Sequence, residues 1–268
     1  MPELPEVETI KRGLAKKIIG QTITGVHIKD RMVIGSGNLK KFISGVGSRE
    51  IIRVERRGKA VIIILSGNGF LVIQLAMTGQ LITGKELAES KVSLKLSGGK
   101  YLNYNDRRRL GRLSFVEDLK GMKFLRTLGP EPLSNDFNRS WLGERLKSKK
   151  APIKSILMNQ QFVAGIGNIY ASEILFRSKI NPLKAGCTLS DNEIGRLCRM
   201  TADVLREAIR LRGSSVDTYR DTDGKKGGFV NRIKVYGRDK KKCVLCGTPI
   251  ERVVLSGRST FFCKRCQH

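Results

Sequence analysis

The sequence is poor in histidine, with only His27 and His268 among its 268 residues. This scarcity argues against Ser-His-Asp triads and against hydrolases that hold a catalytic metal with several histidines. We therefore expect any chemistry on this chain to use amines and carboxylates.

Long apolar runs are also missing, as are a signal peptide and a basic amphipathic anchor. We therefore expect a soluble, cytoplasmic protein with no membrane partner.

Acidic residues are scarce as well, since the chain has 24 Asp and Glu against 51 Lys and Arg, for a formal net charge of +27. A field of that sign attracts polyanions, and each phosphate contact adds affinity by releasing counterions. Nucleic acid is the leading expected partner.

A length of 268 residues favours two domains and a small additional module. Near the start, Val7, Ile10, Leu14 and Ile18 recur at helical spacing, and Gly20 closes the predicted helix. Short β segments with Gly-containing turns follow between residues 22 and 116, which indicates a mostly antiparallel β-sandwich. Strands are predicted at 51–54, 60–65, 70–75, 92–96, 101–104 and 113–116.

The second half changes character after Gly129-Pro130-Glu131-Pro132, which begins a polar stretch typical of a hinge. Residues 152–212 show helical patterns, including a capping box from Ser190 to Glu193. The Gly-, Ser-, Thr- and Asp-rich residues 213–229 are expected to form a mobile loop.

Four of the six cysteines form two C-x-x-C pairs, Cys243 with Cys246 and Cys263 with Cys266, separated by sixteen residues. This spacing is a strong signal for a closed four-thiolate zinc site, and a closed site leaves no coordination position for a substrate. Two disulfides are the less favoured alternative in an intracellular chain. We expect one structural zinc ion.

The stretch Q-Q-F-V-A-G-I-G-N-I-Y-A-S-E-I at residues 160–174 predicts a turn followed by a helix. Gly165 and Gly167 permit a tight turn, and the backbone amides that open the helix could receive a phosphate. Asn168 would add a side-chain donor. The glycines alone are also compatible with an ordinary helix-turn-helix corner.

The amino terminus reads M-P-E-L-P-E-V-E. Removal of Met1 would leave Pro2 with a secondary amine, and an α-amino group titrates near ~8, so part of it is unprotonated at neutral pH. Such an amine can attack an electrophilic carbon and form an iminium, while Glu3 can act as acid or base beside it. The alternative is that both residues merely lead into the first helix.

These three stretches together resemble bacterial formamidopyrimidine-DNA glycosylases over nearly the whole chain. The resemblance implies an α+β multidomain fold, with an N-terminal antiparallel β-sandwich and flanking helix and a C-terminal helical domain that carries a helix-two-turn-helix motif and a four-Cys zinc finger. The corresponding division is residues 1–130 for the β-sandwich catalytic domain, 131–150 for the hinge, 151–232 for the helical DNA-binding domain and 233–268 for the zinc finger.

The same resemblance assigns roles to single residues. The catalytic set it implies is Pro2, Glu3, Lys59 and Arg258. The implied DNA contacts, which include side chains that fill the space left by an extruded nucleotide, are Met77, Lys91, Arg108, Leu110, Lys149, Lys154 and Asn168. The zinc ligands are Cys243, Cys246, Cys263 and Cys266.

Three positions depart from the family pattern. Leu110 stands where the family usually has Phe, and it lacks aromatic stacking worth about 1–3 kcal/mol per base. Gln74 and Lys91 replace family histidines, and Lys91 is still expected to serve a phosphate.

The implied function is a bifunctional DNA glycosylase and AP lyase of base excision repair. It would remove oxidised purines (8-oxoguanine, formamidopyrimidines) from double-stranded DNA and act at abasic sites, through a Pro2 Schiff base followed by β,δ-elimination. We expect a monomer, associated with the bacterial nucleoid. The alternatives are an endonuclease VIII-like glycosylase for oxidised pyrimidines and a non-catalytic damaged-DNA-binding protein.

Overall fold

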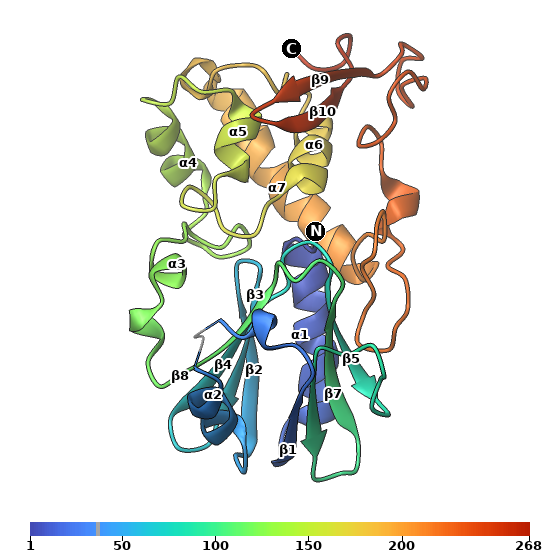
Figure 1. The fold of residues 1–268 in the computed structure, drawn as a ribbon. Helices are drawn as coiled ribbons and strands as arrows, with labels where there is room; N and C mark the ends of the chain where they lie inside the picture. The colour runs from blue at the N-terminus through green and yellow to red at the C-terminus, as the bar shows by residue number, and fades with distance from the viewer. Residues whose placement is uncertain (36–37) are drawn as a thin grey trace. The chain divides into compact units, whose positions relative to one another are not determined.

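The computed structural model describes residues 1–35 and 38–268. The chain forms two compact units, which we call the N-terminal unit (Met1–Arg126 with Ile209–Val230) and the C-terminal unit (Thr127–Ala208 with Asn231–His268). The α+β fold class is confirmed (Figure 1). The division into four parts stays a prediction. None of the helices in the described residues combines the length and the apolar character that a bilayer crossing needs.

The N-terminal unit contains two four-stranded sheets, and all their paired strands are antiparallel. One sheet has the order β1 (Ile23–Ile28), β6 (Val92–Leu96), β7 (Tyr101–Asp106), β5 (Gly79–Gly84), and the other has the order β2 (Ile51–Arg57), β3 (Ala60–Leu65), β4 (Gly69–Gln74), β8 (Arg112–Val116). The predicted β-sandwich is confirmed. The short helices of this unit are η1 (Arg31–Val33), α2 (Leu39–Val46), η2 (Leu119–Gly121) and α3 (Lys123–Arg126).

Helix α1 (Leu4–Ile18) packs with the two sheets in the hydrophobic core of the N-terminal unit. Its side chains Val7, Ile10, Leu14 and Ile18 are buried in one cluster with residues of both sheets, among them Ile63, Leu94 and Phe115. The helical period predicted from the sequence therefore marks the face that packs on the sandwich.

Within the N-terminal unit, two strands are absent from the predicted set, β1 and β5, and they are the two edges of one sheet. Strand β5 begins and ends with glycine, and β1 carries Gly25 where its register against β6 shifts. Edge strands commonly carry bulges and glycines, which interrupt the alternation of apolar and polar residues along the strand. The sequence signal is weak at these strands for that reason.

The remaining elements begin with α4 (Arg139–Leu146), which lies inside the predicted hinge. They continue with α5 (Ile153–Met158), α6 (Asn168–Arg177), η3 (Gly186–Thr188), α7 (Asp191–Arg210), η4 (Phe229–Arg232), β9 (Glu251–Leu255) and β10 (Arg258–Phe262). The predicted capping box is confirmed, because the Ser190 N–H donates to Glu193 Oε2 at 2.8 Å and the Glu193 N–H to Ser190 Oγ at 3.4 Å.

A buried carboxylate joins α6 to the segment that leads into the zinc-finger hairpin. Glu173 is fully buried, and its two oxygens accept backbone N–H groups of Lys234, Val235 and Tyr236 at 2.9–3.0 Å. Burial raises the pKa of Glu173, and the three amides oppose that rise. This single side chain satisfies three successive backbone donors.

We predict that Glu173→Gln destabilises the C-terminal unit. The amide keeps one acceptor oxygen and places an NH₂ group against a backbone donor, which costs about 2 kcal/mol. A thermal melt should show its transition lowered by roughly 5 °C. The matched control is Glu144→Gln, which removes an exposed pair with Lys147 and should change stability by less than about 0.5 kcal/mol. Equal melting of the two variants would contradict the role given to Glu173.

Candidate active site and nucleic-acid interface

The predicted nucleophile and its acid or base lie at the start of α1. Pro2 and Glu3 are buried, whereas Met1 is exposed. Glu3 is the N-cap, and its N–H donates to Glu6 Oε2 at 2.9 Å in a capping box. Glu6 Oε1 accepts the Ser214 N–H at 2.6 Å. The cap fixes the chain entering the helix, and Glu6 connects that entry to the start of the 213–229 loop.

Lys59 occupies the two-residue turn between β2 and β3. Gly58 supplies the positive φ of 55° at the first turn position, where glycine is favoured in tight hairpins. Arg56 donates to the Gly58 carbonyl at 3.0 Å and to Glu8 Oε2 at 3.1 Å, so it links this turn to α1. Burial alone would raise the pKa of Glu8, but hydrogen bonds from Arg12 and Arg56 hold it below its ordinary value. Arg56 is thus tied to an ionised partner.

Met77, Arg108 and Leu110 lie in two connections that each cross from one sheet to the other. Residues 75–78 join β4 to β5, and residues 107–111 join β7 to β8. Arg108 Nη1 lies 3.1 Å from Met77 Sδ, and Leu110 is 47% exposed. The structure therefore brings two of the predicted space-filling side chains, Met77 and Arg108, together, and Leu110 lies in the same connection as Arg108.

Lys91 lines an open cavity of about 480 Å³ in the same unit, together with Asp30 and Arg109. Arg109 Nε pairs with Asp30 Oδ2 at 2.6 Å. Burial opposes ionisation of Asp30, yet hydrogen bonds from Met32 and Arg109 hold its pKa below the ordinary value. Lys29 and Arg31 also line the cavity, so four cations face two acids, Asp30 and Glu89.

The 213–229 loop, expected to be mobile, is anchored at several points. Lys17 Nζ donates to Thr83 Oγ1, Thr222 Oγ1 and Asp223 Oδ1 at 3.2, 3.0 and 2.5 Å. The Asp221 carboxylate closes a turn by accepting N–H groups of Asp223 and Lys225. The amine of one helical lysine thus binds both β5 and the loop.

In the C-terminal unit, the predicted turn before α6 is built around Gln160. Its Oε1 accepts the Gly165 N–H at 2.9 Å, and its Nε2 donates to the carbonyls of Met158 and Ile166 at 2.9 and 2.8 Å. Gly165 has φ of 84°, and Gly167 is the N-cap of α6. The turn predicted from the glycines is confirmed.

Lys154, Asn168 and Arg258 gather at the β9–β10 hairpin. Lys154 Nζ donates to Ser259 O at 3.1 Å and to Thr260 Oγ1 at 2.9 Å, and Asn168 Nδ2 donates to Ser259 O at 3.1 Å. Arg258 is exposed at the first position of β10. Lys154 is only 1% exposed, so it supports the hairpin as well as lining a cavity of about 180 Å³ beside Arg258.

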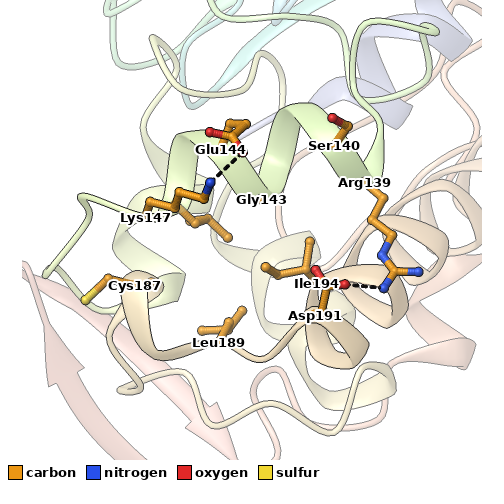
Figure 2. Close-up of a pocket in the computed structure, with 11 residues that line it drawn as sticks. Arg139, Ser140, Gly143, Glu144, Lys147, Cys187, Leu189, Asp191 and Ile194 are labelled. Atoms are coloured by element: carbon orange, nitrogen blue, oxygen red, sulfur yellow. Dashed lines mark hydrogen bonds and ion pairs between the residues drawn. The ribbon is translucent and has the colours of Figure 1, made fainter.

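Lys149 is exposed in the turn after α4, where its N–H donates to the Leu146 carbonyl at 2.9 Å. An open cavity of about 620 Å³ lies near this turn, between α4 and the start of α7 (Figure 2). Ion pairs Arg139–Asp191 and Lys147–Glu144, both at 2.6 Å, flank it. None of the predicted site residues lines this cavity.

The four cysteines of the C-x-x-C pairs converge, with all four sulfur ligand atoms within 4.8 Å of one another. Sγ–Sγ distances include 3.5 Å for Cys246–Cys263 and 4.0 Å for Cys243–Cys266. A tetrahedral zinc with Zn–S bonds of about 2.3 Å requires sulfur spacings of about 3.8 Å. The donors fit one structural zinc ion, and they pack beside Phe176 of α6 in a small apolar cluster.

Sequence reasoning missed several residues that position these groups, above all Asp106, Glu6 and Lys17. Each forms hydrogen bonds with residues far away in the sequence or with backbone groups. Glu6 accepts the Ser214 N–H, and Lys17 donates to Asp223. The sequence carries no local signal for these roles, because the burial of Glu6 and Asp106 and the distant partners of Lys17 appear only in the fold.

Comparison with known proteins supports the same assignment in three segments. A model described as the formamidopyrimidine-DNA glycosylase N-terminal domain matches residues 1–113, and one described as the H2TH domain of the same glycosylase matches residues 128–220. A zinc finger found in FPG and IleRS matches residues 240–268.

Relatives match over the full length. The formamidopyrimidine-DNA glycosylases of Pelotomaculum thermopropionicum and Chloroflexus aurantiacus are 40% and 41% identical, covering all of this chain and 99% and 98% of those proteins. The crystal structure of MutM (Fpg) from Thermus thermophilus matches with a TM-score of 0.90 at 39% identity, over 99% of this chain and 98% of that one. A complex of Lactococcus lactis Fpg with abasic-site DNA matches with a TM-score of 0.92 at 31% identity, over 99% of each chain. The chain belongs to the formamidopyrimidine-DNA glycosylase family.

Proposed function

We propose that this protein is a bifunctional DNA glycosylase and AP lyase that removes oxidised purines in base excision repair. The observation that carries the proposal is the placement of Pro2 directly ahead of a capped helix, beside the buried carboxyl group of Glu3. Removal of Met1 would turn the Pro2 nitrogen into a secondary amine at that fixed position.

In the proposed reaction the Pro2 amine attacks C1′ of the deoxyribose. A new N–C1′ bond forms, the glycosidic bond breaks, and the base leaves with a proton. Glu3 assists opening of the sugar ring by proton transfer to O4′: the C1′–O4′ bond breaks, and the nitrogen lone pair forms an iminium with C1′. The iminium makes the C2′ proton acidic, so its loss expels the 3′ phosphate, and a second elimination expels the 5′ phosphate. Water then releases the sugar fragment from Pro2.

The phosphates are assigned to cations of both units. Lys59 and Arg258 assist at the two leaving phosphates, while Lys91, Lys149 and Lys154 bind the backbone. Asn168, at the first position of α6, supplies a further donor. Contacts between these cations and phosphates release counterions, so binding should weaken steeply with salt.

The zinc ion supplies folding free energy to the C-terminal unit and no step of the reaction. The four thiolates hold the ends of the segment that contains β9 and β10, and Arg258 lies on β10. A fixed hairpin keeps the backbone at Arg258 in one position.

An endonuclease VIII-like activity on oxidised pyrimidines is the nearest alternative. Leu4, the V-E-T continuation of the first helix and the 213–229 loop with Asp223-Gly224-Lys225 favour the purine enzyme. Excision assays on duplexes with oxidised guanine and with oxidised thymine separate the two activities. We further propose that the protein acts as a monomer in the bacterial cytoplasm, in association with the nucleoid.

Borohydride trapping tests the nucleophile. The wild-type protein should form a covalent adduct with abasic or lesion DNA, because the iminium is reducible, and Pro2→Gly should form much less. Pro249→Gly, at an exposed proline, should trap like the wild type. Mass spectrometry of the amino terminus must show loss of Met1. A protein that binds damaged DNA and never gives an adduct would instead be a non-catalytic scaffold.

Zinc removal tests the C-terminal unit. Cys243→Ser, or chelation, should weaken DNA binding at least about 100-fold in fluorescence anisotropy, because the hairpin folds around its metal. The β signal of the N-terminal unit in circular dichroism should remain. Cys187→Ser is the matched control, since Cys187 lies outside the thiolate cluster and is exposed. Unchanged affinity in a protein shown to be free of zinc would overturn this expectation.

A further inference from the structure

The two connections that carry Met77, Arg108 and Leu110 share one anchor, the carboxylate of Asp106. Asp106 is the last residue of β7 and is fully buried. It pairs across the ladder with Gly79, the first residue of β5, which directly follows the 75–78 connection. Asp106 therefore lies where both connections start or end.

Both oxygens of this carboxylate are engaged. Oδ1 accepts the hydroxyl of Thr78 and the N–H of Arg108, the latter at 3.2 Å. Oδ2 accepts the Gly111 N–H at 2.7 Å and the Tyr104 hydroxyl at 3.2 Å. Burial and the nearby Asp106 charge raise the pKa of Tyr104, so its hydroxyl keeps its proton and stays a donor.

Thr78 completes the link between the connections. Its Oγ1 accepts the Arg108 N–H at 3.1 Å while its own hydrogen goes to Asp106. The Met77 connection and the Arg108 connection are thereby held by one closed set of hydrogen bonds. Hydrogen bonds to an ionised acceptor are about twice as strong as neutral ones.

The backbone of both connections needs such support. Ala76 and Arg109 have φ of 48° and 56°, a region that costs non-glycine residues of the order of 1–2 kcal/mol each. Gly111 cannot be replaced, because a Cβ there would overlap Tyr104 Oη and approach the Gln74 carbonyl within 2.5 Å. We call these two connections, residues 75–78 and 107–111, the tips. Their backbone conformation is unfavourable by itself, so contacts with surrounding residues must hold it.

We propose that Asp106 is the positioning residue for nucleotide extrusion, holding Met77, Arg108 and Leu110 in the geometry that fills the vacated space. This inference rests on the proposed function and adds a residue to it. Asp106 acts through the tips and touches no reacting atom. Its loss should therefore harm steps that require a base to leave the stack, and spare chemistry on a nucleotide that is already unstacked.

The test compares two substrates with Asp106→Asn, which keeps the shape and removes one acceptor. Single-turnover excision of 8-oxoguanine from a duplex should fall about 30-fold, equivalent to ~2 kcal/mol. Strand cleavage at an abasic site in single-stranded DNA should stay within about threefold of the wild type. A 2-aminopurine beside the lesion should show a slower fluorescence rise, which reports unstacking directly.

Two further variants complete the design. Asp118→Asn is the matched control at an exposed acid of the same unit, and Asn can replace its hydrogen bond to the Lys120 N–H. Thr78→Val removes only the bridging hydroxyl, so it should show a smaller loss on the duplex with the same sparing of the single strand. If Asp106→Asn does not fold, the comparison of duplex and single-stranded substrates with Thr78→Val tests the proposal in its place.

Duplex excision at the wild-type rate by folded Asp106→Asn overturns the proposal. An equal loss on both substrates also overturns it, since that pattern belongs to a residue needed for the chemistry. Failure of the proposed function looks different, because the wild-type protein itself would then neither excise the base nor cleave the abasic strand.

Discussion

Backbone N–H groups of the functional segments converge on three carboxylates that are almost fully buried. Glu6 accepts amides from Glu3 and Ser214, and Asp106 accepts amides from Arg108 and Gly111. Glu173 accepts three successive amides before the zinc-finger hairpin. A buried carboxyl group is costly unless its oxygens are engaged, and here backbone N–H groups engage both oxygens of each one. Removing Glu173, for example, would leave three successive backbone donors without this acceptor.

This arrangement is well suited to a chain with 51 basic and only 24 acidic residues. Acids placed inside the fold do not neutralise cations at the surface that must meet phosphates. At the Lys91 cavity, by contrast, Asp30 pairs with Arg109, but four cations face only two acids, so positive charge stays in excess there. The abundant basic residues thus supply the long-range attraction to DNA, while several of the few acids order the fold.

The features predictable from the sequence are those with a local signal. The zinc ligands are two C-x-x-C pairs, the first helix has a 3.6-residue period, and the turn at Gly165 sits beside its helix. Edge strands β1 and β5 lacked such a signal. The burial of Lys154 could not be predicted either, because its partners Ser259 and Thr260 lie more than a hundred residues away. Lys154 was predicted as a phosphate contact, and in this structure it also holds the Arg258 hairpin.

At Leu110, the backbone conformation of the tip and the identity of the side chain are independent of each other. The backbone around it is set by the positive φ of Arg109, the crowded Gly111 and the acceptors of Asp106, none of which depends on the residue at position 110. The Leu110 side chain itself is 47% exposed and contributes little to the core. In the proposed function, a leucine in place of the family's usual phenylalanine would offer a base aliphatic contact instead of stacking.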